Sequence, residues 1–189
     1  MRFLLRVLAL GSPLIVPALA ADAALASVPD SVKPVLEHTE AQFLSVAQAM
    51  PERLYSFVPP GTGFEGVRTF AEQIKHVACN NFAFFNEIDH KTPPPHCENG
   101  GPATAATKSE LIQYLRDSFA YGNKVLAAMT DTSAKEKVPP GQYWGNNTSL
   151  TVAIAAVWHI ADTYGQLVPY LRMNHIVPPA TARNPLKVR

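Results

Sequence analysis

Six histidines are the residues of this sequence best suited to chemistry, since an imidazole can transfer protons or bind a metal ion near neutral pH: His38, His76, His90, His96, His159 and His175. One lies on the polar face of a predicted helix and three lie in or beyond loops, so we expect solvated or capping roles for these four. His76 and His159 differ, because each lies in the middle of a predicted helix beside its apolar stripe, where a charged imidazole needs a partner. The pair is either two hydrogen-bonded histidines at the edge of the core or two ligands of a shared metal ion.

N-terminal capping residues define the two predicted helices that carry His76 and His159. Thr69 to Glu72 form a capping box, in which the threonine hydroxyl and the glutamate carboxylate each satisfy a free backbone amide, and this box starts the helix of His76. Asn147 or Thr148 caps the helix of the second histidine, which we predict to run to about Met173. Each histidine therefore comes from a different helix.

Two further helices complete the predicted core. Asp30 or Ser31 caps the first of them, with Pro34 in its opening turn, and a capping box over residues 107–110 starts the other. Apolar residues follow the helical period in all four helices, and strand-like alternation is scarce. The run from Leu150 to Trp158 is so apolar that we expect protein to surround it. Four amphipathic helices joined by polar loops predict an all-α helical bundle.

The N-terminus has the pattern of a signal peptide over residues 1–20. Arg2 and Arg6 form a basic start, an apolar run follows, and the small residues Ala18 and Ala20 mark cleavage after Ala20. Glycine and proline interrupt the apolar run, so we expect no stable membrane span. We therefore predict an exported protein, periplasmic or secreted, whose mature chain of residues 21–189 forms one domain.

Export determines how the two cysteines are interpreted. Cys79 and Cys97 are the only cysteines, and a lone pair in an oxidising compartment favours a disulfide. Closing this loop stabilises the fold by roughly 3 kcal/mol in the chain-entropy model. The bond would tether the proline-rich residues 92–95 to the helix that holds Cys79.

Composition excludes several classes of protein. Hydrophobic residues make up 47% of the 189 residues and charged residues 16%, which is incompatible with global disorder. The formal net charge is +1 and no block of lysine or arginine occurs, so the electrostatic footprint of a nucleic-acid-binding protein is missing. We expect no nucleic-acid partner.

Two segments carry a resemblance to a known family. The chain resembles the closing helix of the DinB-like (DinB/YfiT) superfamily over Trp158 to Pro179, WHIADTYGQLVPYLRMNHIVPP, and its second helix over Phe70 to Phe85, FAEQIKHVACNNFAFF. Together with the order of the helices, the resemblance covers nearly all of the mature chain. It implies an antiparallel four-helix bundle with one long crossover connection.

The resemblance also implies a metal site. Members of this family commonly hold a divalent metal ion on three histidines, which implies His76 and His159 as two ligands and Thr163 at the third position. A threonine hydroxyl is a poor ligand for zinc or nickel beside imidazole, so the third position is degraded. Asp162 is a possible substitute for the third ligand, but it lies about 100° around the helix from Thr163 and would need a twist of the helix to reach the site. Cys79 could bind only as a thiolate, which the predicted disulfide forbids.

The implied function is divalent-metal binding, with zinc or nickel as the ion, in an enzyme that acts on a small molecule or a low-molecular-weight thiol. The metal would lower the pKa of a bound thiol or water. The alternative is a metal-free helical bundle that binds a small molecule or a partner protein, with His76, His159 and Thr163 as a hydrogen-bonded polar cluster. A haem bundle is disfavoured because its second axial ligand, Met50, falls at a helix end. We consider a small-molecule substrate and a homodimer as partners, and the sequence names no catalytic residue.

Overall fold

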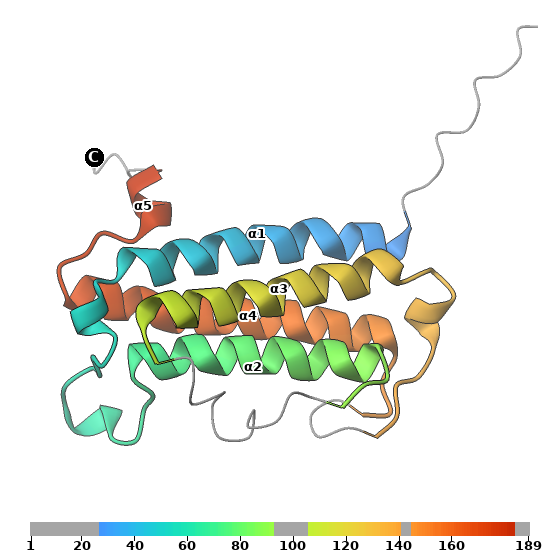
Figure 1. Ribbon diagram of the computed structural model, residues 1–189, viewed down its shortest axis with the longest axis horizontal. Helices are drawn as coiled ribbons and strands as arrows, with labels where there is room; N and C mark the ends of the chain where they lie inside the picture. The colour runs from blue at the N-terminus through green and yellow to red at the C-terminus, as the bar shows by residue number, and fades with distance from the viewer. Residues whose placement is uncertain (1–26, 93–105, 141–144, 184–189) are drawn as a thin grey trace, which may run out of the picture.

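The computed structural model describes residues 27–92, 106–140 and 145–183, and four long helices dominate these ranges (Figure 1). They are α1 (Val28–Ala49), α2 (Phe70–Ile88), α3 (Lys108–Ala128) and α4 (Ser149–Met173). Short helical segments flank them: η1 (Glu52–Leu54), η2 (Thr62–Phe64), η4 (Ser133–Lys135) and α5 (Pro179–Arg183). The predicted signal peptide over residues 1–20, His96 and Cys97 lie outside the described residues.

The long helices pack as a four-helix bundle in which α1 and α2 each contact both α3 and α4. In Figure 1, α2 and α3 run in one direction while α1 and α4 run in the other. Hydrogen bonds agree, because the backbone N–H of Val28 donates to Asp131 while Lys108 donates to the carbonyl of Met50, so α1 and α3 are antiparallel. Since α2 ends and α3 begins at opposite ends of the bundle, their connection spans its length. The predicted bundle with a long crossover is confirmed.

Three of the four predicted helix starts are confirmed. Thr69 and Thr107 each form a capping box, and of the two candidates for α4 it is Thr148 that accepts from the backbone of the first turn. The predicted start of α1 is wrong by a few residues. Its cap is Ser27, whose hydroxyl accepts from the backbone N–H of Asp30, so Asp30 is the third helical residue and returns the hydrogen bond.

The core is built from the inward faces of all four long helices. Its largest fully buried side chains are Phe43, Phe70, Phe85, Phe119, Leu36, Met50, Ile74, Leu111, Leu115, Leu126, Ile160 and Leu167. These residues alternate with exposed polar positions along each helix, as the helical period requires. The bundle therefore has one continuous core.

The first half of α4 corrects one prediction, because protein does not surround it. Ile154 is 52% exposed and Trp158 is 62% exposed, although both lie in the apolar run. They are four residues apart and so share one face of the helix, which points away from the bundle. The inward face instead carries the small residues Ala153 and Ala156, which are fully buried. Because the outer face of this segment is also apolar, the sequence pattern did not distinguish it from the inward face.

Candidate functional site

The antiparallel packing of α2 and α4 brings His76 and His159 together. Their Nε2 atoms lie 3.0 Å apart, and the ring centroids are 4.9 Å apart with planes inclined at 63°. Each imidazole is in the middle of its helix and partly buried, as the sequence predicted. The two rings therefore meet edge on, with one nitrogen of each directed at the other.

Asn80 joins the histidine pair and was not predicted from the sequence. Its Nδ2 lies 3.0 Å from Nε2 of His159 and 3.1 Å from Nε2 of His76, and the side chain is only 6% exposed. It follows His76 by one helical turn, so both project from the same face of α2 toward α4. That spacing was the available signal, since a polar residue four positions from a candidate ligand shares its face.

Asn81, the next residue, serves a different interface. Neither asparagine was given a role from the sequence, yet Asn81 points to α3, where its Nδ2 donates to the hydroxyl of Ser118 at 3.2 Å. Adjacent residues on a helix differ in direction by about 100°, so one asparagine faces α4 and the other faces α3. Only Asn80 belongs to the histidine site.

Thr163 lies one turn beyond His159 on α4, at the position that the resemblance assigns to the third ligand. Its side chain is 2% exposed, and its hydroxyl donates to the backbone carbonyl of His159 at 3.0 Å. A serine or threonine hydroxyl within a helix commonly bonds to the carbonyl four residues back. The proton of this hydroxyl is therefore directed at its own helix, and the role of Thr163 as a metal ligand stays a prediction.

Asp162 and Cys79 are the remaining candidates for a third ligand. Asp162 is exposed, and its carboxylate accepts a hydrogen bond of 2.8 Å from the amide of Gln166. Cys79 is buried on α2, and its predicted partner Cys97 lies outside the described residues, so the disulfide stays a prediction. Within the described ranges, no three His, Cys, Asp or Glu side chains come together in a way that could hold a metal ion.

Burial controls the charge of the two site histidines. The pKa of His76 is lowered to about 4, first because burial removes water from the imidazolium and then because Arg68 and His159 oppose its charge. Burial also lowers the pKa of His159, with a smaller opposing effect from the Asp162 carboxylate. Both rings are therefore neutral at pH 7, which is the form that binds metal ions.

The surroundings limit access of water to the pair. The ring of Phe84 lies 5.8 Å from that of His159, centroid to centroid, and Nδ1 of His159 is buried with no hydrogen-bond partner among the described residues. On one side, the Gln73 amide donates to Gln166 at 3.1 Å and so links α2 to α4. These contacts hold the two helices at a fixed separation across the histidines.

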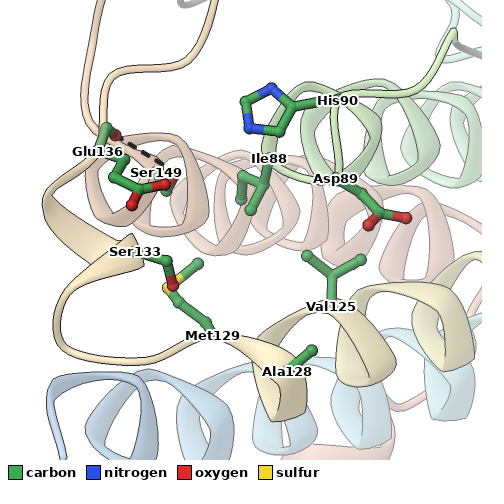
Figure 2. A pocket seen from close by; sticks show the side chains of 9 residues that line it. All are labelled: Ile88, Asp89, His90, Val125, Ala128, Met129, Ser133, Glu136 and Ser149. Atoms are coloured by element: carbon green, nitrogen blue, oxygen red, sulfur yellow. Dashed lines mark hydrogen bonds between the residues drawn. The ribbon is translucent and has the colours of Figure 1, made fainter.

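A cavity of about 200 Å³ lies at the end of the bundle where α2 and α3 end and α4 begins (Figure 2). In Figure 2, Ile88 and Val125 point into it. The charged residue Asp89 at its rim already accepts a hydrogen bond of 3.0 Å from the hydroxyl of Tyr121. The cavity shares no lining residue with the histidine pair.

The remaining described histidines take the roles that the sequence predicted. His38 is exposed on α1 and contacts the Gln42 amide, while His90 and His175 are exposed and have positive φ angles of 53° and 58°. None of these three contributes to the pair on α2 and α4. Within the described ranges, no helix combines the length and apolar character that crossing a lipid bilayer requires.

The fold and the site together define a class of protein: a four-helix bundle with a crossover between parallel α2 and α3 and with facing histidines on α2 and α4. Residues 36–167 match the DinB superfamily, so the chain belongs to this superfamily. The chain is also similar to a conserved protein of Enterococcus faecalis known from its crystal structure. The TM-score is 0.62 at 15% identity, over 78% of this chain and 97% of that chain, which shows a shared fold. No curated protein matches the chain.

Proposed function

We propose that this protein binds a divalent metal ion through Nε2 of His76 and Nε2 of His159. The observation that carries the proposal is the separation of 3.0 Å between these two atoms. Two nitrogen atoms that bind one zinc ion at about 2.0–2.1 Å lie roughly 2.9–3.4 Å apart for ligand angles of about 90–110°. The pair therefore has the spacing of two ligands of one ion.

The chemistry of the donor set supports the same proposal. Both imidazoles are neutral at pH 7, so each can offer a lone pair without first losing a proton. Imidazole nitrogen suits zinc and nickel, and membership of the DinB superfamily, whose members often bind metal, points the same way. Two histidines leave coordination positions open for a substrate.

The finer proposal is an enzyme that acts on a small molecule or a low-molecular-weight thiol. When bound, the metal supplies a Lewis acid that polarises a ligand or lowers its pKa. The protein's own residues hold the site in place: α2 and α4 present the imidazoles, the ring of Phe84 excludes water from one side, and the Gln73–Gln166 hydrogen bond fixes the helices. We propose that it works outside the cytoplasm, after removal of residues 1–20.

Metal content and calorimetry test the metal-binding proposal. Protein purified from its native compartment without a histidine tag should contain zinc or nickel, or should bind either ion in a calorimetric titration. His76→Ala and His159→Ala should each lower the affinity at least about tenfold, because each removes one imidazole ligand. His38→Ala is the matched control, since His38 is exposed on α1, and should bind as the wild type does.

Two results would contradict the proposal. One is a wild-type protein that binds neither zinc nor nickel after incubation with an excess of either ion. The other is a His76→Ala variant that binds them as tightly as the wild type. Either result would favour a metal-free bundle in which His76, His159 and Asn80 form a hydrogen-bonded polar cluster that recognises a small molecule or a partner protein.

A further inference from the structure

We propose that the outer face of α4 is the interface of a homodimer, in which two copies of this chain pack α4 against α4 in antiparallel directions. The proposal uses a surface that takes no part in the metal site, and it does not depend on metal binding. Four exposed, uncharged residues form this surface: Ile154, Trp158, Ala161 and Gly165. Their helical spacing keeps all four on one face, and we call them the α4 stripe.

The α4 stripe has the composition of the centre of a protein–protein interface. Its two bulky residues lie on adjacent turns, and Trp158 is 62% exposed while Ile154 is 52% exposed. Between Ser149 and Gly165, Asp162 is the only aspartate, glutamate, lysine or arginine. Interface centres are enriched in aromatic residues and depleted of charged ones, and apolar residues that are exposed together mark a binding surface. The stripe therefore suits an equally uncharged partner surface, and a second copy of α4 offers one.

Antiparallel packing lets the bulky residues of one copy meet the small residues of the other. With the twofold axis halfway between positions 159 and 160, Trp158 lies level with Ala161 of the second copy, and each such contact occurs twice. Ile154 then lies level with Gly165 of the second copy, where the surface is open, since a Cβ atom at Gly165 meets nothing within 4 Å. A parallel pair would instead set Trp158 level with Trp158 and Gly165 level with Gly165, which crowds one turn and leaves a gap at another.

The edge of the α4 stripe is also complementary in charge. Asp162 lies beside the stripe and, measured along the helix axis, within about 1.5 Å of the level of Trp158 in the second copy. Gln166 donates to Oδ2 of this carboxylate, so Oδ1 can accept a hydrogen bond from the indole N–H of that tryptophan. A buried indole N–H usually needs an acceptor, and a carboxylate is a strong one. The edge of the interface therefore pairs an anion with a hydrogen-bond donor.

The area of this contact predicts a reversible dimer. The twofold axis lies near the middle of α4 (Ser149–Met173), so the two helices overlap along roughly 33 Å. A helix with its side chains is about 10–12 Å wide, so the contact covers roughly 330–400 Å² on each copy. Stable interfaces bury about 800 Å² per partner, and smaller ones are weak or transient. We therefore expect a dissociation constant in the micromolar range.

Sedimentation velocity of the untagged protein tests the proposal. Over concentrations from about 1 μM to about 300 μM, the mean mass should rise from one copy toward two. Trp158→Glu and Ile154→Glu should each raise the dissociation constant at least about tenfold, because each would bury an unpaired charge in the interface. Val35→Glu is the matched control, since Val35 is 48% exposed and lies on α1, and should stay within about twofold of the wild type. All three side chains are exposed in a single copy, so circular dichroism and thermal unfolding should show that each variant is folded.

Exchange of the large and small residues tests the antiparallel pairing. Trp158→Ala removes the bulky residue and Ala161→Trp sets two indoles level with each other, so each variant should weaken the dimer at least about fivefold. The double variant Trp158→Ala/Ala161→Trp again has one large and one small residue at each contact and should recover most of the lost affinity. In a parallel pair each position faces itself, so the effects of the two substitutions would simply add.

Three results would overturn the proposal: a wild type that sediments as one copy at every concentration, a Trp158→Glu variant that dimerises as tightly as the wild type, and additive effects in the double variant. A single-copy protein that floats with vesicles of phosphatidylglycerol and phosphatidylethanolamine, and does not do so as Trp158→Glu, would assign the α4 stripe to a lipid surface instead. His76→Ala changes no residue of the stripe and should dimerise as the wild type does. That variant separates failure of the dimer from failure of the proposed metal binding.

Discussion

Burial favours the neutral form of His76 and His159 in the folded protein. A histidine that is fully exposed to water gains and loses its proton near neutral pH. Burial in the interface of α2 and α4 lowers the pKa of these two histidines and keeps them neutral at pH 7. The cost is that the folded state resists protonation where the unfolded chain accepts it. Because of this difference, the free energy of unfolding should depend on pH.

We predict that the free energy of unfolding falls as the pH falls from about 6.5 toward 4. The pKa of His76 is about 4 in the folded protein and 6.5 in its ordinary state, so over this range the unfolded chain binds more protons and is favoured. The lowered pKa of His159 acts in the same direction. Denaturant unfolding at several pH values, with a chelator present, measures the effect.

His76→Gln is the control for this pH dependence, because glutamine does not titrate. Its stability should fall less steeply than that of the wild type between pH 6.5 and 4.5. The Glu72 carboxylate, whose pKa is lowered by its capping hydrogen bonds to Thr69, contributes below its ordinary value of 4.5 and so outside most of this window. Equal slopes in wild type and variant would show that His76 is not held neutral by the fold.

At the scale of the helices, α2 and α3 approach closely because Gly122 has no side chain. A Cβ atom placed there would lie 2.7 Å from Cδ2 of Phe85 and closer still to Cε2 of the same ring. The ring belongs to the fully buried core, where close packing resists its displacement. Glycine is therefore required at this point by packing, despite its low helix propensity.

We predict opposite effects for alanine at the two glycines inside long helices. Gly122→Ala should destabilise the protein, because overpacking costs about 1–3 kcal/mol while the better helix propensity of alanine returns at most about 1 kcal/mol. Gly165→Ala on α4 should stabilise it by about 0.5–1 kcal/mol, since a Cβ there meets no atom within 4 Å and the position is exposed. Urea unfolding of the two variants measures both signs. Equal stabilisation by both substitutions would show that α2 and α3 are not packed as closely as described.

At the scale of the whole molecule, the parallel arrangement of α2 and α3 requires a connection that spans the bundle. A long connection costs conformational entropy when its ends are fixed at opposite ends of the bundle. Cys79 lies near the middle of α2 and Cys97 belongs to this connection. The predicted disulfide would fasten the crossover to the helix that carries His76 and Asn80.

We predict that Cys97→Ser lowers the free energy of unfolding by about 2–4 kcal/mol under oxidising conditions, because the unfolded chain regains the freedom that the bond removes. Chemical denaturation with and without a reductant measures the difference. Reduction should bring the wild type to the stability of the variant and leave the variant unchanged. Two free thiols found by labelling the native protein would contradict this prediction.

The helices and their starts are the features that the sequence predicted best. Capping boxes at Thr69 and Thr107 depend on residues three positions apart, so local contacts alone determine them. The start of α1 was misplaced because Ser27, Asp30 and Ser31 are all suitable caps, and local preference does not rank them. The superfamily was also recognisable from two segments of the sequence, and the match over residues 36–167 confirms it.

The site itself needed the tertiary structure. His76 and His159 were candidates from the sequence, but 83 positions separate them, and only the antiparallel packing of α2 and α4 brings their Nε2 atoms to 3.0 Å. The direction of Asn80 toward α4, and of Asn81 toward α3, depends on which helix packs on which face of α2. The exposure of Trp158 likewise depends on which face of α4 packs against the bundle. Helical periodicity determines which residues share a face, whereas only long-range packing decides what that face meets.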